Sequence, residues 1–308
     1  MSNIAVITPI KHLPGVQQLI ESKGNVFYLE EGNKQQVRNL LLTKNINTIL
    51  CNPNQQTYKI DQELLEGTQV SLINTCSTGM NHIDVDYCND VNITIYSLTK
   101  DYELIKQLPS TSELAFGLML SLLRQIPESK HHTLNYQWDY TQFVGRQIKD
   151  LKVGIVGYGR LGKIMEGYCK AFGAQTFIYD PYVDVFQTSL EQMFQECDVI
   201  SLHVHVTDET KYMVSSKLLD LSKKDLYIIN TSRGEIVNEL DIIDALNTKK
   251  LTGYGTDVIE DEFGDLTKSP IIKGMNEGKN IIVTPHTGGM TIEGQTKAYT
   301  WAINKIKK

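Results

Sequence analysis

The chain has 308 residues, of which 41% are hydrophobic and 21% charged, and its formal net charge is -6. Single hydrophobic cores usually stop growing at about 250 to 300 residues, so two domains are expected. The acidic balance excludes the basic field with which proteins bind nucleic acids and anionic membranes. The first residues lack a signal-peptide pattern, and no apolar segment reaches the roughly 20 residues of a membrane span, so a cytoplasmic location is expected.

The first hundred residues alternate short β-branched runs with amphipathic stretches. Five runs predict strands, at Ile4–Thr8, Val26–Leu29, Thr48–Leu50, Val70–Asn74 and Ile93–Tyr96. A strand followed by a helix, repeated, is typical of parallel β-α-β units whose sheet is covered on both faces. This first series contains no glycine-rich phosphate loop.

A second series begins after Pro109. Ser110 and Glu113 have the Ser-x-x-Glu spacing of a capping box, which predicts the start of a nearly all-apolar helix through Arg124. A helix that is apolar all round must be buried, here against the other domain or another subunit. Six further runs predict strands, at Lys152–Val156, Thr176–Tyr179, Asp198–Leu202, Leu226–Asn230, Gly253–Asp257 and Asn280–Thr284. The alternation therefore restarts as a full Rossmann-sized unit.

The first strand of this second series leads into a glycine-rich loop, Gly157-Tyr158-Gly159-Arg160-Leu161-Gly162, which a helical pattern follows. Strand, tight turn and helix form the context of a dinucleotide site. The first glycine allows the turn, the second lets the backbone approach a pyrophosphate, and the third lets the helix pack on the strand. A tight turn without a ligand is the alternative interpretation.

Asp180 strengthens the dinucleotide interpretation. It stands 18 residues after Gly162 at the end of the next predicted strand, near the roughly 20-residue spacing of an acid that binds ribose hydroxyls. A turn-forming acid before Pro181 is the alternative. A carboxylate at this place repels a 2′-phosphate, and no Lys or Arg occupies positions 181–185, so NAD is expected rather than NADP.

Four blocks of residues, in their order and spacing, resemble the D-isomer-specific 2-hydroxyacid dehydrogenase family over most of the chain. They are Ser77-Thr78-Gly79-Met80-Asn81-His82-Ile83-Asp84, the glycine-rich loop, Asn230-Thr231-Ser232-Arg233-Gly234, and Asp257-Val258-Ile259-Glu260-Asp261-Glu262 followed by Pro285-His286-Thr287-Gly288-Gly289. The resemblance implies an α/β fold of two domains. A Rossmann NAD-binding domain, residues 102–284, would be inserted into a flavodoxin-like substrate domain, residues 1–101 and 285–308.

The same resemblance implies how the domains and subunits are joined. Two crossover helices, near residues 102–124 and 291–305, would hinge the domains. The apolar helix after Pro109 and an arm around Trp138 resemble the family's dimer contacts, so a homodimer is expected.

The resemblance assigns the chemistry, hydride transfer between NAD(H) and a small 2-keto acid, to Arg233, Glu262 and His286. A guanidinium offers a fixed fork of donors and stabilises oxyanion character as hydride reaches C2. Histidine suits the proton transfer, and a carboxylate beside it favours the imidazolium that donates to the carbonyl oxygen. Glu260 and Asp261 are near rivals for this carboxylate, and family spacing favours Glu262. Taken singly, each residue has an ordinary alternative as a surface charge, a solvated acid or a satisfied loop histidine.

The resemblance also names binding residues. Backbone N–H groups of Ser77, Thr78 and Gly79 would hold the substrate carboxylate opposite Arg233, because open α/β sheets bind ligands in loops that follow strands. A plain glycine turn is the alternative there. The cofactor would be contacted by the glycine-rich loop and by Thr78, Asp180, Val204, Thr231 and Asp257, the last near the nicotinamide carboxamide.

Residues that differ from those of related enzymes limit the class of substrate that we expect. Thr78 stands where the similar phosphite dehydrogenases carry lysine, and Glu262 stands where formate dehydrogenases carry glutamine, which argues against both activities. No arginine lies between Arg38 and Arg124, so a small monocarboxylic 2-keto acid is expected rather than a phosphorylated one. Two lysines, Lys11 and Lys59, are the alternative phosphate partners.

One rival function comes from a different class. The family's transcriptional corepressors keep this fold and cofactor site, so a non-enzymatic NAD-sensing binding protein is the alternative. The five cysteines are odd in number and contain no Cys-x-x-Cys pair, which predicts reduced packing residues and no metal site.

Overall fold

The chain divides into two compact units in the computed structural model, which describes residues 2–53, 58–184 and 187–307. Unit 1 comprises Met1–Leu108 and Gly289–Lys308, and unit 2 comprises Pro109–Gly288. Unit 2 is thus inserted into unit 1. The dividing points, 108/109 and 288/289, lie a few residues after the expected 101/102 and 284/285.

Unit 1 is built on a parallel sheet. Its strands among the described residues are β1 (Ser2–Val6), β2 (Gly24–Tyr28), β3 (Thr48–Cys51), β4 (Leu72–Thr75) and β5 (Thr94–Tyr96). Their order is β2-β1-β3-β4-β5, and every neighbouring pair is parallel. This is the flavodoxin-like order, whose topological switch point, the usual ligand position, lies at the carboxyl ends of β1 and β3.

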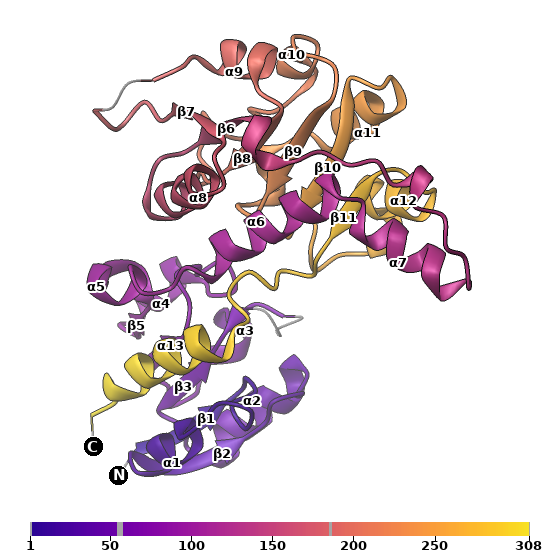
Figure 1. The fold of residues 1–308 in the computed structure, drawn as a ribbon. Coiled ribbons are helices and arrows are strands. Elements are labelled where there is room, and N and C mark those ends of the chain that lie inside the picture. Colours follow the sequence, from indigo (N-terminus) through magenta and orange to yellow (C-terminus); the bar gives the residue numbers. More distant parts are fainter. Residues whose placement is uncertain (1, 54–57, 185–186, 308) are drawn as a thin grey trace. The chain divides into compact units, whose positions relative to one another are not determined.

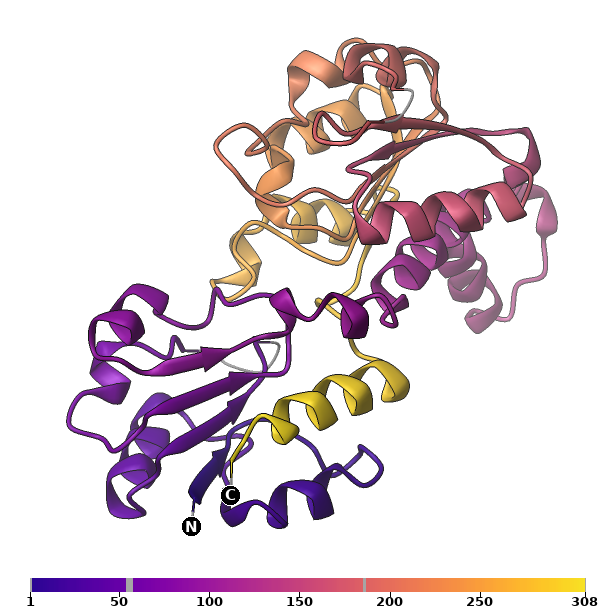
Figure 2. The same cartoon turned by 90° about the vertical axis from the view of Figure 1, so that its left-hand side faces the viewer.

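Helices cover both faces of the sheet in unit 1. One face packs against α1 (Val16–Glu21) and the C-terminal helix α13 (Ile292–Asn304), the yellow helix beside the indigo start of the chain in Figure 2. The opposite face packs against α2 (Lys34–Thr43), α3 (Gln62–Leu65) and α4 (Val85–Asp90). The part of this unit that the structure describes also contains the 3₁₀ turn η2 (Leu98–Lys100) and α5 (Tyr102–Ile105). Both faces are therefore buried, as a parallel sheet requires.

Unit 2 holds a second parallel sheet. Its described strands are β6 (Lys152–Val156), β7 (Gln175–Tyr179), β8 (Val199–Leu202), β9 (Leu226–Asn230), β10 (Leu251–Thr256) and β11 (Ile281–Val283). They follow the order β11-β10-β9-β8-β6-β7, and all neighbours are parallel. The connections from β6 and β8 run in opposite directions, so the switch point of unit 2 lies at the carboxyl ends of these two strands.

Two groups of helices enclose this second sheet (Figure 1). One face packs against α6 (Ser110–Leu123) and α8 (Arg160–Ala171). The other packs against α9 (Leu190–Glu196), α10 (Ser216–Leu219), α11 (Glu239–Asn247) and α12 (Pro270–Asn276). Outside residues 185–186, this unit also contains helix α7 (Ile126–Leu134) and the 3₁₀ turns η3 (Tyr140–Gln142), η4 (Ile148–Asp150), η5 (Gly234–Ile236) and η6 (Leu266–Lys268).

Helix α6 corrects two of the sequence-based expectations. The capping box is wrong, because Ser110 is the first helical residue and Pro109 stands at the cap position without a side-chain hydrogen bond. The expected cover by another domain or subunit is also wrong for most of its apolar side chains. They belong to one core cluster with residues of β6, β9 and α8: Ala115, Phe116, Leu118, Met119, Leu122 and Leu123. The apolar pattern indicates burial but carries no information about the covering element.

All eleven strand predictions overlap strands, and their ends differ by at most two residues. Strand β1 shows the reason. It runs from Ser2 to Val6 because these residues pair with Gly24–Tyr28, whereas the β-branched run extends further, to Thr8. Pairing with a neighbouring strand, rather than side-chain type, sets where a strand ends. The predicted α/β class with a Rossmann-type unit inserted into a flavodoxin-like unit is confirmed.

The five cysteines are free and buried, as expected. Within the described ranges, no group of three or more His, Cys, Asp or Glu side chains is arranged to hold a metal ion. None of the helices found there is long and apolar enough to cross a membrane.

Asp198, which precedes β8, bonds to three residues near the amino ends of the strands in unit 2. Its side chain is 5% exposed and accepts hydrogen bonds from Lys223 Nζ at 2.8 Å, the Lys152 N–H at 2.8 Å and Arg146 Nη2 at 3.0 Å. Burial raises the pKa of Asp198, but these three donors outweigh burial and hold the pKa below its ordinary value. The carboxylate therefore stabilises the fold above about pH 4, and this contribution is lost as the pH falls through the depressed pKa.

We expect Asp198→Asn to lower the free energy of unfolding at pH 7 by about 2 kcal/mol, because the buried carboxylate loses its charge-assisted hydrogen bonds with the partly exposed Lys223 and Arg146. The difference from wild type should persist from pH 7 to about pH 4 and should shrink only when urea unfolding is repeated below pH 4, as the pH falls through the depressed pKa of Asp198. Asp220→Asn is the matched control, since Asp220 is 61% exposed and its one ion pair among the described residues is with Lys250. It should change stability by less than about 0.5 kcal/mol. Equal effects of the two changes would contradict the account.

Candidate active site

Two loops meet at the switch point of unit 2. The glycine-rich loop follows β6, and His203 and Val204 follow β8. Gly157 has a φ of 89°, in the left-handed region that favours glycine, and a Cβ there would lie 2.5 Å from the His203 carbonyl oxygen and 2.8 Å from the Val204 side chain. Only glycine fits both the turn and this close approach.

The same loop leaves an open place at the start of α8. A Cβ on Gly162 would lie 2.0 Å from the Gly157 carbonyl oxygen, so the third glycine allows the helix to pack closely. A Cβ on Gly159, by contrast, would meet no atom within 4 Å. Gly159 is the N-cap residue of α8, and no side-chain hydrogen bond caps this end of the helix. The positive amino end of α8 therefore faces a place open to an anionic ligand such as a pyrophosphate.

Asp180 follows β7 and is held against the glycine-rich loop. Its Oδ2 accepts from the Tyr158 N–H at 2.7 Å, and its Oδ1 accepts from the Tyr182 N–H at 3.0 Å. Each oxygen keeps a lone pair for a further donor, such as a ribose hydroxyl. Sequence reasoning missed a second bond that holds Tyr158. Its hydroxyl donates to Glu166 of α8 at 2.7 Å, and this bond raises the pKa of Tyr158 to about 12.

Thr231, at the carboxyl end of β9, carries an orphaned polar atom. It is 7% exposed, and its Oγ1 has no hydrogen-bond partner among the described residues. Buried hydroxyls normally have a partner, so this one is suited to a bound ligand. The open place at Gly159, the carboxylate of Asp180 and this hydroxyl together fit a dinucleotide cofactor in unit 2.

The three catalytic candidates follow three neighbouring strands. Arg233 comes after β9, Glu262 after β10 and His286 after β11, and the sheet order places β10 between the other two. Neighbouring parallel strands lie about 4.8 Å apart, so loops leaving their carboxyl ends lie side by side. The three loops that carry these residues therefore leave the same edge of the sheet in unit 2.

His286 and Glu262 are in contact. His286 Nδ1 lies 2.7 Å from Glu262 Oε2, with the side chains 35% and 20% exposed. The rival Glu260 is bonded instead to the Tyr212 hydroxyl. Because Glu262 holds Nδ1, proton exchange between His286 and a ligand would use Nε2.

Asp257 clasps the segment that carries His286. It is 2% exposed, and its Oδ1 accepts from Thr284 Oγ1 at 2.5 Å and the Thr287 N–H at 2.7 Å, while Oδ2 accepts from the Gly288 N–H at 2.8 Å. His286 has a φ of 53°, a conformation that non-glycine residues rarely adopt unless their surroundings impose it. Sequence reasoning placed Asp257 near a cofactor and missed this clasp, which joins residues about thirty positions apart.

The loop with Arg233 packs on the loop that leads to Glu262. A Cβ on Gly234 would lie 2.0 Å from the Ile259 carbonyl carbon, so the two backbones touch only because this residue is glycine. Arg233 Nη1 donates to the Ser232 carbonyl oxygen at 2.6 Å. Among the described residues it forms no ion pair with a carboxylate. A half-buried guanidinium without a carboxylate is suited to an anionic ligand.

The loop after β4 in unit 1 presents a row of backbone donors. Among the described residues, no acceptor is bonded to the N–H groups of Ser77, Thr78, Gly79 and Met80. Successive free N–H groups in a loop make an anion-binding concavity. Thr78, which sequence reasoning gave to both substrate and cofactor, is exposed, and its carbonyl oxygen accepts from Thr99.

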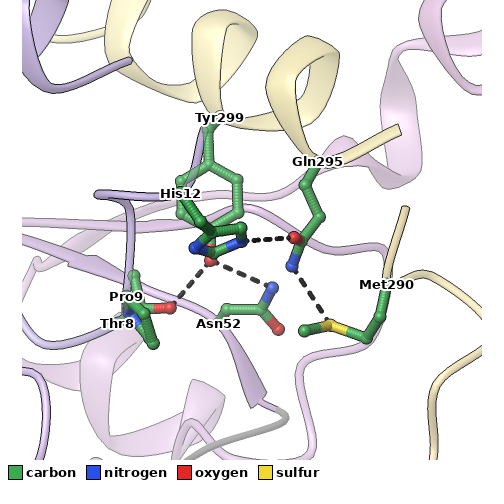
Figure 3. Close-up of a pocket in the computed structure, with 7 residues that line it drawn as sticks. All are labelled: Thr8, Pro9, His12, Asn52, Met290, Gln295 and Tyr299. Carbon is green, nitrogen blue, oxygen red and sulfur yellow. Dashed lines mark hydrogen bonds between the residues drawn. The ribbon is translucent and has the colours of Figure 1, made fainter. Parts of the chain in front are cut away.

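A small cavity lies at the switch point of unit 1 (Figure 3). Its volume is about 10 Å³, enough for roughly one water molecule and too small for a keto acid. Tyr299 of α13 bonds to Thr8 at 2.7 Å and to Asn52 at 3.2 Å, and His12 bonds to Gln295 at 2.9 Å. None of these residues was singled out as a site residue. Their bonds tie α13 to the loops after β1 and β3.

The family model described as D-isomer specific 2-hydroxyacid dehydrogenase, NAD binding domain, matches residues 116–288. Among solved structures, the D-lactate dehydrogenase of Aquifex aeolicus complexed with NAD and lactic acid is 26% identical, has a TM-score of 0.74, and is aligned over 98% of this chain and 93% of that one. The apo D-lactate dehydrogenase of Escherichia coli has a TM-score of 0.84 at 23% identity, over 99% and 95% of the two chains, and shows the fold alone.

Curated relatives give a second comparison. The D-3-phosphoglycerate dehydrogenase of Synechocystis sp. is 28% identical over 258 residues, which are 81% of this chain and 45% of that protein. A 2-hydroxyacid dehydrogenase homolog of Zymomonas mobilis is 29% identical over 248 residues, 75% and 73% of the two chains. The chain therefore spans about half the length of the D-3-phosphoglycerate dehydrogenases that it matches.

Proposed function

Because the chain belongs to the D-isomer specific 2-hydroxyacid dehydrogenase family, whose members are NAD(P)-dependent oxidoreductases, we propose that it transfers hydride between NAD(H) and a small monocarboxylic 2-keto acid or its D-2-hydroxy acid. Unit 2 serves as the NAD-binding domain and unit 1 as the substrate domain. The observation that carries this proposal is the His286–Glu262 pair, in which the loops after β11 and β10 bring the two side chains to 2.7 Å beside the loop of Arg233 after β9.

Each residue of this set has one task. The nicotinamide, when bound, supplies or accepts the hydride at C2 of the substrate. Arg233 binds the 2-keto acid and stabilises negative charge on the carbonyl oxygen. In reduction His286 donates the Nε2 proton to that oxygen, and in oxidation it takes the proton back from the hydroxyl. Glu262 fixes the ring through its contact with Nδ1, and the N–H groups of the loop Ser77–Met80 bind the substrate carboxylate.

Asp180 leads us to propose NAD rather than NADP. Its carboxylate accepts from ribose hydroxyls and repels a 2′-phosphate. Steady-state kinetics with both reduced cofactors should give the higher kcat/KM for NADH. Asp180→Ala should lower kcat/KM for NADH about tenfold and shrink the preference over NADPH, because a charge-assisted hydrogen bond is lost.

Asp184→Ala is the matched control, since it removes the same charge from an exposed position four residues further on. It should leave the cofactor preference within twofold of wild type. A wild-type preference for NADPH, or equal effects of the two changes, would overturn the assignment to Asp180.

Two cations of unit 1, Arg38 and Lys34, are poorly placed to bind a phosphorylated substrate. Arg38 Nη1 donates to the carbonyl oxygens of Glu63 and Leu64 at 2.6 and 3.1 Å, and Lys34 is bonded to Asp61 at 2.9 Å and to Glu63. These groups are occupied within the unit and do not form the donor fork that suits a phosphate. A monocarboxylic 2-keto acid fits the remaining set better.

The test is NADH oxidation against glyoxylate, pyruvate, hydroxypyruvate, 3-phosphohydroxypyruvate and longer branched and aromatic 2-keto acids. Hydroxypyruvate and its phosphate ester are a matched pair, and the unphosphorylated acid should have the higher kcat/KM. A tight, productive complex with the ester would contradict the substrate class. If the protein bound NADH but oxidised it with none of these acids, the result would favour the NAD-sensing binding protein.

An apolar arm in unit 2 supports a homodimer. Large side chains that are at least half exposed lie along residues 126–144: Ile126, Leu134, Tyr136, Trp138, Tyr140 and Val144. A contiguous exposed apolar segment of this kind marks an interaction surface, and we propose a second copy of the chain as its partner.

We expect light scattering at micromolar concentration to give twice the 34.8 kDa mass of one chain. The double change Trp138→Ser and Tyr140→Ser should shift the protein toward the monomer. Tyr102→Ser, which removes a 68% exposed aromatic residue of unit 1, is the control and should leave the mass unchanged. A strictly monomeric wild type would contradict the dimer.

A further inference from the structure

A buried chain of hydrogen bonds runs from His82 to the loop Ser77–Met80. His82 Nε2 lies 3.2 Å from Thr75 Oγ1, and Thr75 Oγ1 lies 2.9 Å from Ser77 Oγ. The Ser77 hydroxyl then donates to the Gly79 carbonyl oxygen at 2.7 Å. His82 is 6% exposed and Thr75 is fully buried, so water does not compete for these bonds. None of the proposed catalytic steps uses His82 or Thr75.

The hydrogen bond from Ser77 to Gly79 decides which atom donates in each of the other hydrogen bonds of this series. A carbonyl oxygen can only accept, so Ser77 uses its single hydroxyl proton on Gly79. Ser77 Oγ must therefore accept from Thr75, and Thr75 Oγ1 must accept from His82. The proton of the imidazole is thus on Nε2. Nδ1, which is buried without a partner among the described residues, is a bare lone pair.

The surroundings of His82 keep the ring neutral. Burial lowers the pKa of His82 to about 4, because the charged form is penalised in the core. A proton on Nδ1 would also be a buried donor without an acceptor. Cys51 Sγ lies 3.6 Å from Nε2, and burial raises the pKa of this thiol to about 12, so it adds no charge beside the ring.

The chain of bonds turns a backbone donor of the loop outward. The peptide group between Gly79 and Met80 is planar, so its carbonyl and its N–H point in opposite directions. Because the Gly79 carbonyl is drawn onto Ser77, the Met80 N–H points away from Ser77. The two ends of the loop are fixed separately, by the Cys76 N–H on the Cys51 carbonyl at 2.9 Å and the Ile60 N–H on the His82 carbonyl at 2.8 Å.

We infer that His82 and Thr75 are positioning residues for substrate binding: acting through Ser77, they hold the N–H groups of the loop Ser77–Met80 in the orientation that binds the carboxylate of a 2-keto acid. This inference rests on the proposed function, which assigns that carboxylate to the loop. It gives His82 a task that needs one tautomer of a neutral ring and no proton transfer to substrate.

The tautomer is tested first, without any turnover. Long-range ¹H–¹⁵N NMR of the wild-type protein at pH 7 should show His82 neutral with its proton on Nε2. Thr75→Val should change the His82 signals, and Thr75→Ser, which keeps the hydroxyl, should restore them. A proton on Nδ1 in wild type would overturn the inference, because Thr75 would then donate to the ring and Ser77 would lose its donor.

Kinetics test the consequence. Thr75→Val and His82→Leu should each raise KM for the 2-keto acid about tenfold, the factor that one net hydrogen bond supplies, with kcat and the Kd for NADH within twofold of wild type. Thr75→Ser and His82→Gln keep a donor or relay at the same place and should recover most of the affinity. A merely structural role would lower Tm in both members of each pair and leave KM unchanged, which would overturn the inference.

Two further outcomes separate this inference from the proposed function. If Thr75→Val does not fold, Ser77→Ala interrupts the series of hydrogen bonds at its partly exposed end and should give the same rise in KM. An unchanged KM in Ser77→Ala would overturn the inference. If wild type binds NADH but reduces no 2-keto acid, the proposed function fails and the substrate role of the loop fails with it. The NMR result then still decides whether His82 and Thr75 set the loop.

Discussion

Replacing His286 by asparagine is expected to lower kcat for 2-keto acid reduction by about 10²- to 10⁴-fold, the range that general acid–base catalysis supplies. Asparagine is polar and of similar size but cannot deliver a proton to the carbonyl oxygen. KM for the keto acid and Kd for NADH should change less than about threefold, because the loss falls on the transition state. Steady-state kinetics and NADH fluorescence titration measure both.

The carboxylates near His286 offer a matched pair for this prediction. Glu262→Gln should lower kcat about tenfold or more, because Glu262 holds His286 Nδ1 at 2.7 Å and so fixes the orientation of the acid–base group. Glu260→Gln should stay within twofold of wild type, because Glu260 is bonded to Tyr212 instead. Near-wild-type turnover by His286→Asn, or equal losses in the two glutamate variants, would rule out the proposed acid–base pair.

Arg233→Ala should have an equally large effect on kcat/KM, a fall of about 10³-fold, with KM raised and kcat lowered together. Both parameters change because the guanidinium binds the substrate in the ground state and also stabilises charge on the carbonyl oxygen in the transition state. Initial rates over a wide range of keto acid concentration separate the two parameters.

Arg233→Lys distinguishes charge from geometry. It keeps the positive charge without the planar fork, so kcat/KM should lie between wild type and Arg233→Ala. Arg124→Ala is the control, since Arg124 is an exposed arginine at the end of α6 and should leave kcat/KM within twofold. If Arg233→Ala raised only KM, Arg233 would bind substrate without stabilising the transition state.

Local signals explain why much of the fold was predictable. Strands such as Lys152–Val156 and Leu226–Asn230 have the predicted bounds, because β-branched runs between turns are local features of the chain. The glycine-rich loop was equally visible, since its strand, its turn and its helix follow one another directly. The start of α6 was misplaced because a Ser-x-x-Glu spacing does not show whether the serine backbone is already helical.

Contacts between distant residues explain what was not predictable. Resemblance supplied Arg233, Glu262 and His286 and favoured Glu262 over Glu260 by spacing, but only the structure shows that Glu262 is bonded to His286 and Glu260 to Tyr212. The clasp of Asp257 on the His286 segment and the contact of Gly234 with Ile259 depend on neighbouring strands of the sheet. No periodicity or spacing reports such pairs, and a bond between a carboxylate and a distant backbone N–H leaves no sequence pattern.

Product stereochemistry, measured together with hydride stoichiometry, tests the central proposal most directly. The enzyme is mixed with one equivalent of NADH and an excess of the best 2-keto acid from the panel, and the product is separated by chiral chromatography. The account predicts one D-2-hydroxy acid formed for each NADH oxidised, and almost none with His286→Asn over the same time. An L or racemic product, or bound NADH that is never oxidised, would contradict it.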